Sequence, residues 1–132
     1  RREAEYSPRA VTESERVACR MATKKMAGTI LATRRLEIEA EMSTVKLDYR
    51  ELAPVRGILE NAVDLRMSNL ILYLPDDVAV ENRVQEDMST FRENRNKYFH
   101  PDRAATLIRL TGSMSMSNIR ARRKRYWFFS KK

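Results

Sequence analysis

The sequence predicts an all-α protein, an up-down four-helix bundle, and three observations lead to this prediction. The chain of 132 residues holds only three glycines and four prolines, few for the turns of an all-β fold. Its apolar residues recur at helical spacing over long stretches. With 42% hydrophobic and 33% charged residues, one domain of this length can bury an ordinary core.

The N-terminal part of the chain is predicted to be an extended arm followed by a long helix. Residues 1–11 are polar and contain Pro8, which suits an arm. Thr12 and Glu15 fit a capping box, so the first helix is expected to run from there to about Met42, with Gly28 as its weak point. The chain begins at Arg1, which fits a mature protein that has lost a targeting segment, or a fragment.

Three further helices complete the predicted bundle. The second runs from about Tyr49 to Leu74, and Pro75 ends it. Its apolar stripe consists of Leu52, Val55, Leu59, Ala62, Val63, Leu70 and Leu74. The third helix is expected from about Val78 to Tyr98, and the fourth from near Arg103. The short links between them favour antiparallel neighbours, hence a bundle over residues 12–118.

The sequence offers little that could catalyse a reaction or hold a cofactor. Cys19 is the single cysteine and His100 the single histidine, which excludes an intrachain disulfide, a cysteine zinc cluster and a multi-histidine metal site. His100 is assigned to a turn, Cys19 to a buried inert position, and the pair Asp76 and Asp77 to a helix cap. No phosphate-binding loop is present. We therefore expect no enzyme activity, no cofactor, no metal and no small-molecule substrate.

Two further features concern repeats and methionines. No internal sequence repeat is evident. Of the seven methionines, Met21, Met26, Met67 and Met88 are assigned to core-facing helix positions, whereas Met114 and Met116 fit the helical pattern poorly.

The strongest local signal is a basic and aromatic tail over residues 119–132. Seven of the 26 cations lie there and none of the 18 acids, so the rest of the chain is nearly neutral. Basic residues next to large aromatic rings suit docking to a partner. The predicted partner-binding residues are Arg122, Arg123, Lys124, Arg125, Tyr126, Trp127 and Phe128.

Residues 45–110 resemble the PsbQ family, the extrinsic lumenal subunits of photosystem II. The resemblance lies in an aromatic residue at the start of the second helix, Tyr49, then Leu65-Arg66, the stretch from Met67 to Leu74, and the stop Pro75-Asp76-Asp77. The family usually has Trp where this chain has Tyr49.

This resemblance implies a non-catalytic accessory subunit with a four-helix bundle in the chloroplast thylakoid lumen. Such a subunit would dock on the photosystem II core and other extrinsic subunits, at the membrane face, and stabilise the oxygen-evolving complex. Two alternatives stay open. One is an organellar ribosome-associated protein that binds RNA through the basic tail, the one case in which nucleic acid is a partner. The other is a supernumerary subunit of a mitochondrial respiratory complex.

Overall fold

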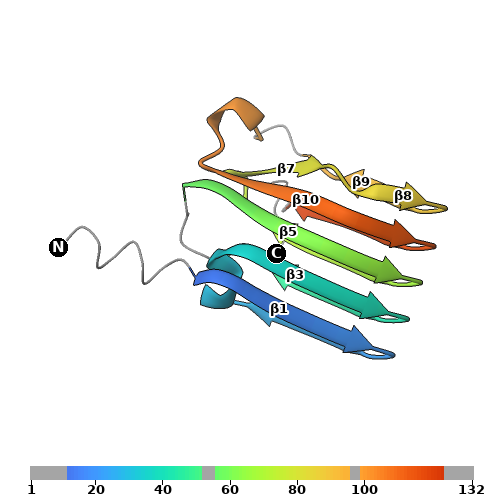
Figure 1. Cartoon of the computed structure of the whole chain (residues 1–132). Coiled ribbons are helices and arrows are strands. Elements are labelled where there is room, and N and C mark those ends of the chain that lie inside the picture. Colours follow the sequence, from blue (N-terminus) through green and yellow to red (C-terminus); the bar gives the residue numbers. More distant parts are fainter. Residues whose placement is uncertain (1–11, 52–55, 96–98, 124–132) are drawn as a thin grey trace, which may run out of the picture.

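The chain folds into two parallel β-sheets, so the prediction of an all-α four-helix bundle is wrong. The computed structural model describes residues 12–51, 56–95 and 99–123. Within them the helical segments are two short 3-10 helices, η1 (Thr29–Ala32) and η2 (Pro101–Arg103), neither long and apolar enough to cross a membrane. The predicted arm, residues 1–11, lies outside the described residues. Figure 1 shows the strands of one sheet side by side, all running in the same direction.

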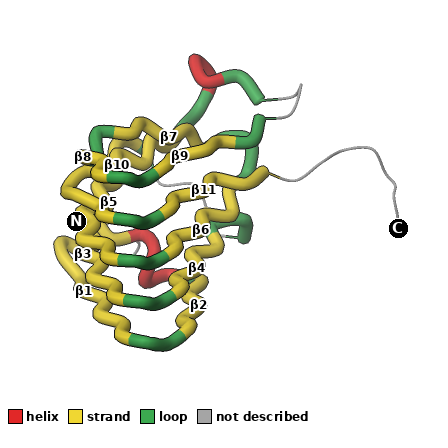
Figure 2. Tube along the Cα trace, turned by 90° about the vertical axis from the view of Figure 1, so that its right-hand side faces the viewer, coloured by secondary structure: helices red, strands yellow, loops and turns green. Residues whose placement is uncertain are grey.

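The two sheets are built from stacked rungs. A rung is one strand of the first sheet, a sharp corner, and one strand of the second sheet (Figure 2). Sheet A contains β1 (Thr12–Arg20), β3 (Thr33–Glu41), β5 (Gly57–Arg66), β10 (Thr106–Ser115), and the short strands β7 (Val78–Asn82) and β8 (Gln85–Asp87). Sheet B contains β2 (Thr23–Ala27), β4 (Thr44–Asp48), β6 (Asn69–Leu74), β11 (Asn118–Arg123) and β9 (Thr90–Glu93).

The order of the rungs in space differs from their order in the chain. Rungs 1, 2 and 3 (β1–β2, β3–β4 and β5–β6) stack in sequence. Rung 5 (β10–β11) then lies between rung 3 and rung 4 (β7–β8–β9). Ile108 of β10, for example, pairs with Leu59 of β5 on one side and with Val80 of β7 on the other. The last rung of the chain therefore holds the fourth in place.

The core lies between the two sheets and follows a strand period of two. In β5 the side chains of Leu59, Asn61, Val63 and Leu65 are buried, and in β6 those of Leu70, Leu72 and Leu74. The predicted second helix used members of this set that are four residues apart. Residues four apart lie on the same side of a helix, and they also lie on the same side of a strand, where the period is two. The pattern was therefore assigned to the wrong period.

The small number of glycines suggested too few turns for a β fold, but methionines form the corners of this one. Five methionines have φ between 47° and 50°, the left-handed region that turns usually fill with glycine. Glycine is required at one point inside sheet A. At Gly112, φ is 101° and an added Cβ would lie 2.0 Å from the carbonyl oxygen of Val63. At this position β10 therefore passes too close to β5 for any side chain.

The two end rungs carry charged residues in register with buried apolar residues of the neighbouring rung. Glu15 of β1 lies in register with the buried Leu36, and Lys24 of β2 with the buried Val45. Both charged residues are exposed. At the other end, Glu93 of β9 lies in register with the buried Ala121. Charged side chains at core positions of an edge disfavour pairing with another strand.

Candidate functional site: the corners and the two outer faces

Each of the five rungs turns its corner with the same three-residue motif. The motif is methionine, then serine or alanine, then threonine or asparagine. Its copies are Met21-Ala22-Thr23, Met42-Ser43-Thr44, Met67-Ser68-Asn69, Met88-Ser89-Thr90 and Met116-Ser117-Asn118. The prediction that the chain has no internal repeat is therefore wrong. The five methionines, in spatial order Met21, Met42, Met67, Met116 and Met88, form one line along the corner edge, which we call the methionine ridge.

Hydrogen bonds between rungs fix the corners in register. The amide of Met42 donates to the carbonyl of Arg66 at 2.9 Å, and equivalent bonds join the other neighbouring corners. The serine hydroxyls form a ladder behind them. The hydroxyl of Ser68 donates to the carbonyl of Arg66 (2.8 Å) and accepts from the amide of Ser43 (3.1 Å). Ser43, Ser68 and Ser117 are buried, so these bonds satisfy polar groups that water does not reach.

The outer face of sheet A is covered with ion pairs between rungs. Arg35 of β3 lies 2.6 Å from Glu60 of β5, its register partner. Arg109 of β10 lies 2.9 Å from Glu81 of β7, also in register. Hydrogen bonds from Thr111 and Arg35 lower the pKa of Glu60. At these positions neighbouring rungs place opposite charges next to each other, whereas Glu39 lies in register with a second acid, Asp64.

The outer face of sheet B is arranged differently. One row across the stack reads Lys25, Lys46, Ile71, Arg120 and Arg92, each in register with the next. The described residues place no carboxylate within ion-pair distance of these four cations. The adjacent row contains Asp48, whose pKa is lowered to about 2, chiefly by hydrogen bonds from Arg50. Neighbouring strands of a sheet lie about 4.8 Å apart, and like charges at that distance repel each other.

The residues predicted as partner-binding fall into three groups. Arg122 is exposed at the end of β11, on the outer face of sheet B. Arg123, in contrast, is buried: its guanidinium lies 3.7 Å from the ring centre of Phe99 and 2.9 Å from Glu93. Burial lowers its pKa, and its guanidinium is enclosed by residues of the chain itself. Residues Lys124, Arg125, Tyr126, Trp127 and Phe128 lie outside the described residues.

The domain boundaries and the core residues predicted from the sequence also differ from those of the structure. Residues 119–123, expected as the start of a tail, belong to β11, and residues 12–118 do not form a helical bundle. Met21, Met67 and Met88 are exposed corner residues instead of core residues, whereas Met26 and Met114 are buried. Tyr49, the aromatic residue that supported the PsbQ resemblance, lies in the core and accepts a 3.1 Å hydrogen bond from Asn61. Burial raises the pKa of its hydroxyl to about 12.

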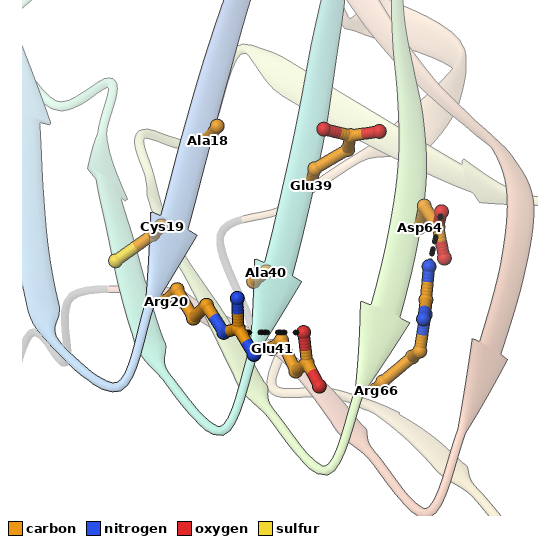
Figure 3. A pocket seen from close by; sticks show the side chains of 8 residues that line it. All are labelled: Ala18, Cys19, Arg20, Glu39, Ala40, Glu41, Asp64 and Arg66. Carbon is orange, nitrogen blue, oxygen red and sulfur yellow. Dashed lines mark ion pairs between the residues drawn. The ribbon is translucent and has the colours of Figure 1, made fainter.

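The shallow pocket in Figure 3 lies beside the corners of rungs 1 to 3. It is lined by Ala18, Cys19, Arg20, Glu39, Ala40, Glu41, Asp64 and Arg66. Arg20 pairs with Glu41, and Arg66 with Asp64, each at 3.7 Å. The thiol of Cys19 points away from these pairs. His100 is exposed just before η2, and no group of three or more His, Cys, Asp or Glu within the described ranges is arranged to hold a metal ion.

Comparison with known proteins gives no relative: no family model, curated protein or solved structure matches this chain. The corners and the outer faces therefore have to be interpreted from their own chemistry.

Proposed function

We propose that this chain is a non-catalytic docking module that binds an acidic protein surface through the outer face of sheet B. The observation that carries the proposal is the row of Lys25, Lys46, Arg120 and Arg92, which has no carboxylate within ion-pair distance among the described residues. Asp48 acts on Lys25 from a longer range and is itself bound by Arg50. Aligned like charges destabilise a sheet unless something else neutralises them. An acidic partner would supply the opposite charge and speed the encounter.

Sheet A supports this choice of face by contrast. There, in-register cations such as Arg35 and Arg109 have carboxylates within 3 Å, so their charge is neutralised within the molecule. Sheet B presents Asp48 as the acid of its outer rows, and this acid is occupied by Arg50 at 2.8 Å. The cations Lys25, Lys46, Arg120 and Arg92 thus lie in one row on one face of the molecule.

The basic and aromatic residues that follow β11 in the sequence are the second part of the proposal. Arg122 ends the face, and Lys124, Arg125, Tyr126, Trp127 and Phe128 follow it directly in the sequence. Buried aromatic rings commonly give much of the affinity of a protein interface, whereas exposed charges mainly steer it. We assign the aromatic residues to the anchoring and the cations of sheet B to the orientation.

Of the function expected from the sequence, docking without catalysis is kept, and the assignment to photosystem II is not. The PsbQ resemblance implied a four-helix bundle, and the chain is instead a stack of β-rungs. Photosystem II and the thylakoid lumen are therefore left out of the proposal, and docking without catalysis is kept. On the described strands of this face RNA binding is less favoured, because single-stranded bases stack on free aromatic rings. Tyr73, the aromatic residue of this face within the described strands, is covered by Arg50 at 4.9 Å. The aromatic residues of the tail keep RNA as the alternative that the experiment has to separate.

The proposal is tested by charge reversal on the two faces. The variant K46E/R120E should weaken binding to immobilised poly-L-glutamate at least tenfold, since it reverses two cations of the row. The matched control R16E/R20E makes the same change in net charge on sheet A and should bind nearly as the unchanged chain does. Both titrations are run at several salt concentrations, and circular dichroism checks that each variant is folded.

Two outcomes would contradict the proposal. Equal losses in the two variants would mean that only net charge matters and that neither face is a docking surface. Tighter binding to poly(U) than to poly-L-glutamate at equal charge concentration would favour the RNA-binding alternative.

A further inference from the structure

The methionine ridge is left unexplained by docking through sheet B. All five of its side chains are at least 42% exposed, and Met88 reaches 80%. Each also holds a backbone with φ between 47° and 50°. A non-glycine residue in this region costs roughly 1–2 kcal/mol, which glycine would avoid. Strain that recurs at five equivalent positions indicates that the methionine side chain itself is used.

The spacing of the ridge suits a metal ion between neighbouring sulfur atoms. The corner hydrogen bonds hold the backbones of Met21, Met42 and Met67 one rung apart. One rung is about 4.8 Å. A metal–sulfur bond is about 2.3 Å, the value known for zinc and thiolate. Sulfur atoms on adjacent rungs that point the same way are therefore separated by about two metal–sulfur bonds.

The surroundings of the ridge suit a soft monovalent ion. A shallow concavity is lined by Met21, Met42 and Met67 together with Ala22, Thr23, Ser43, Thr44 and Asn69, so no charged side chain enters it. The nearest arginines, Arg20 and Arg66, are each paired with a carboxylate. Neutral thioether ligands select Cu(I) over the harder Mg²⁺, Ca²⁺ and Mn²⁺ ions, which prefer oxygen.

We propose that adjacent methionines of Met21, Met42 and Met67 bind a soft monovalent metal ion of the Cu(I) and Ag(I) class between their two sulfur atoms. Met42, in the middle rung, is common to the two possible pairs, with Met21 as its partner on one side and Met67 on the other. Each sulfur donates a lone pair, and no proton is released on binding. Because thioethers do not titrate, the affinity is constant between pH 5.5 and 7.5. This inference does not depend on the function proposed for sheet B.

The experiment uses Ag(I) as the probe in a chloride-free buffer. All measurements are made on the full chain with C19A, because the half-buried thiol of Cys19 would bind the same ion. NMR of ¹³C-labelled methionine methyl groups follows the seven methionines individually. The signals of Met21, Met42 and Met67 should shift on titration, whereas those of the buried Met26 and Met114 should stay in place.

A substitution then tests the sulfur atom. M42L keeps an apolar side chain of similar size and should weaken Ag(I) binding at least tenfold by isothermal titration calorimetry. M26L is the matched control and should bind as the C19A chain does. The proposal is overturned if the ridge methyl signals do not move or if M42L binds equally well. It is also overturned if the affinity for Ag(I) decreases as pH is lowered from 7.5 to 5.5, which would point to His100 or carboxylates as ligands. The methyl spectra decide the question even if M42L fails to fold.

Discussion

Sheet A and sheet B are made by the same rungs in the same order, yet they arrange charge and backbone in different ways. Sheet A pairs opposite charges between rungs, with Arg35–Glu60 and Arg109–Glu81 as examples, and contains a glycine with a positive φ inside a strand, Gly112. Sheet B carries an in-register row of cations that have no carboxylate within ion-pair distance in the part of the chain that the structure describes. The difference teaches that one face is organised for the stability of the stack, whereas the other keeps charge available at some cost in stability.

The largest effect is expected at Gly112, inside a strand of sheet A. G112A places a methyl group 2.0 Å from the Val63 carbonyl and forces φ of 101° on a residue with a side chain. We expect a loss of more than about 4 kcal/mol in the free energy of unfolding, measured by urea denaturation. The control G28A has a similar φ of 88° but open space around the added carbon, and should lose about 1 kcal/mol. Similar losses in both would mean that β10 shifts to accommodate the methyl.

The second effect concerns the corner that both sheets share. S68A removes the hydroxyl that bonds the Arg66 carbonyl and leaves the buried amide of Ser43 without its acceptor. The expected loss is about 2–3 kcal/mol. The control A22S adds a hydroxyl at the end of the ladder, where the described rungs provide no amide to donate to it, and should change stability by less than about 0.5 kcal/mol. A loss below about 1 kcal/mol for S68A would show that water replaces the hydroxyl.

The third effect is the pH dependence contributed by Asp48, the acid on the face of sheet B. Its pKa is about 2 in the folded chain and 3.8 ordinarily. A carboxyl with a lowered pKa stabilises the fold above its ordinary pKa, and this contribution disappears as pH falls from about 4 to 2. This difference in pKa corresponds to a contribution of about 1–2 kcal/mol to the free energy of unfolding, since the Asp48 side chain is largely covered. The loss of stability between pH 4 and 2 should be smaller in D48N than in the unchanged chain, and equal slopes would contradict the assignment.

The smallest effect compares single charges on the two faces. R109Q breaks the pair with Glu81 on sheet A and should lower stability by a few tenths of a kcal/mol, as is usual for exposed pairs. R120Q removes a repelled cation from sheet B and should raise stability by a similar amount at low salt. Both changes should fade at high salt. The same sign in both variants would remove the distinction between the faces.

The sequence contained the signals of this fold, but two of them were ambiguous and one was overlooked. Leu59 with Val63, and Leu70 with Leu74, are four residues apart, which fits both a helix and a strand. The buried Asn61 between them broke the alternation that would have identified the strand. The hydrogen bond between Asn61 and Tyr49 could not be predicted from the sequence, because the two residues lie on different rungs.

The overlooked signal was the recurring corner motif. Copies such as Met42-Ser43-Thr44 and Met67-Ser68-Asn69 are short, unevenly spaced and turned by methionine, which is not a usual turn residue. They could have been found by aligning the methionines. The surface of sheet B was harder to predict, because Lys25, Lys46, Arg120 and Arg92 come from four separate parts of the chain. Only the register of the sheet brings them into one row.

The insertion of the fifth rung between the third and the fourth has a consequence for how the protein is made. A ribosome completes β9 before it begins β10, so rung 4 emerges before the neighbour that it needs. About 30 residues separate the ends of β9 and β11, which is about 2–6 s of synthesis. In the described part of the chain β7 pairs with β10 alone, so it has no partner in sheet A until β10 has been synthesised. Completion of the fourth rung therefore waits for the fifth.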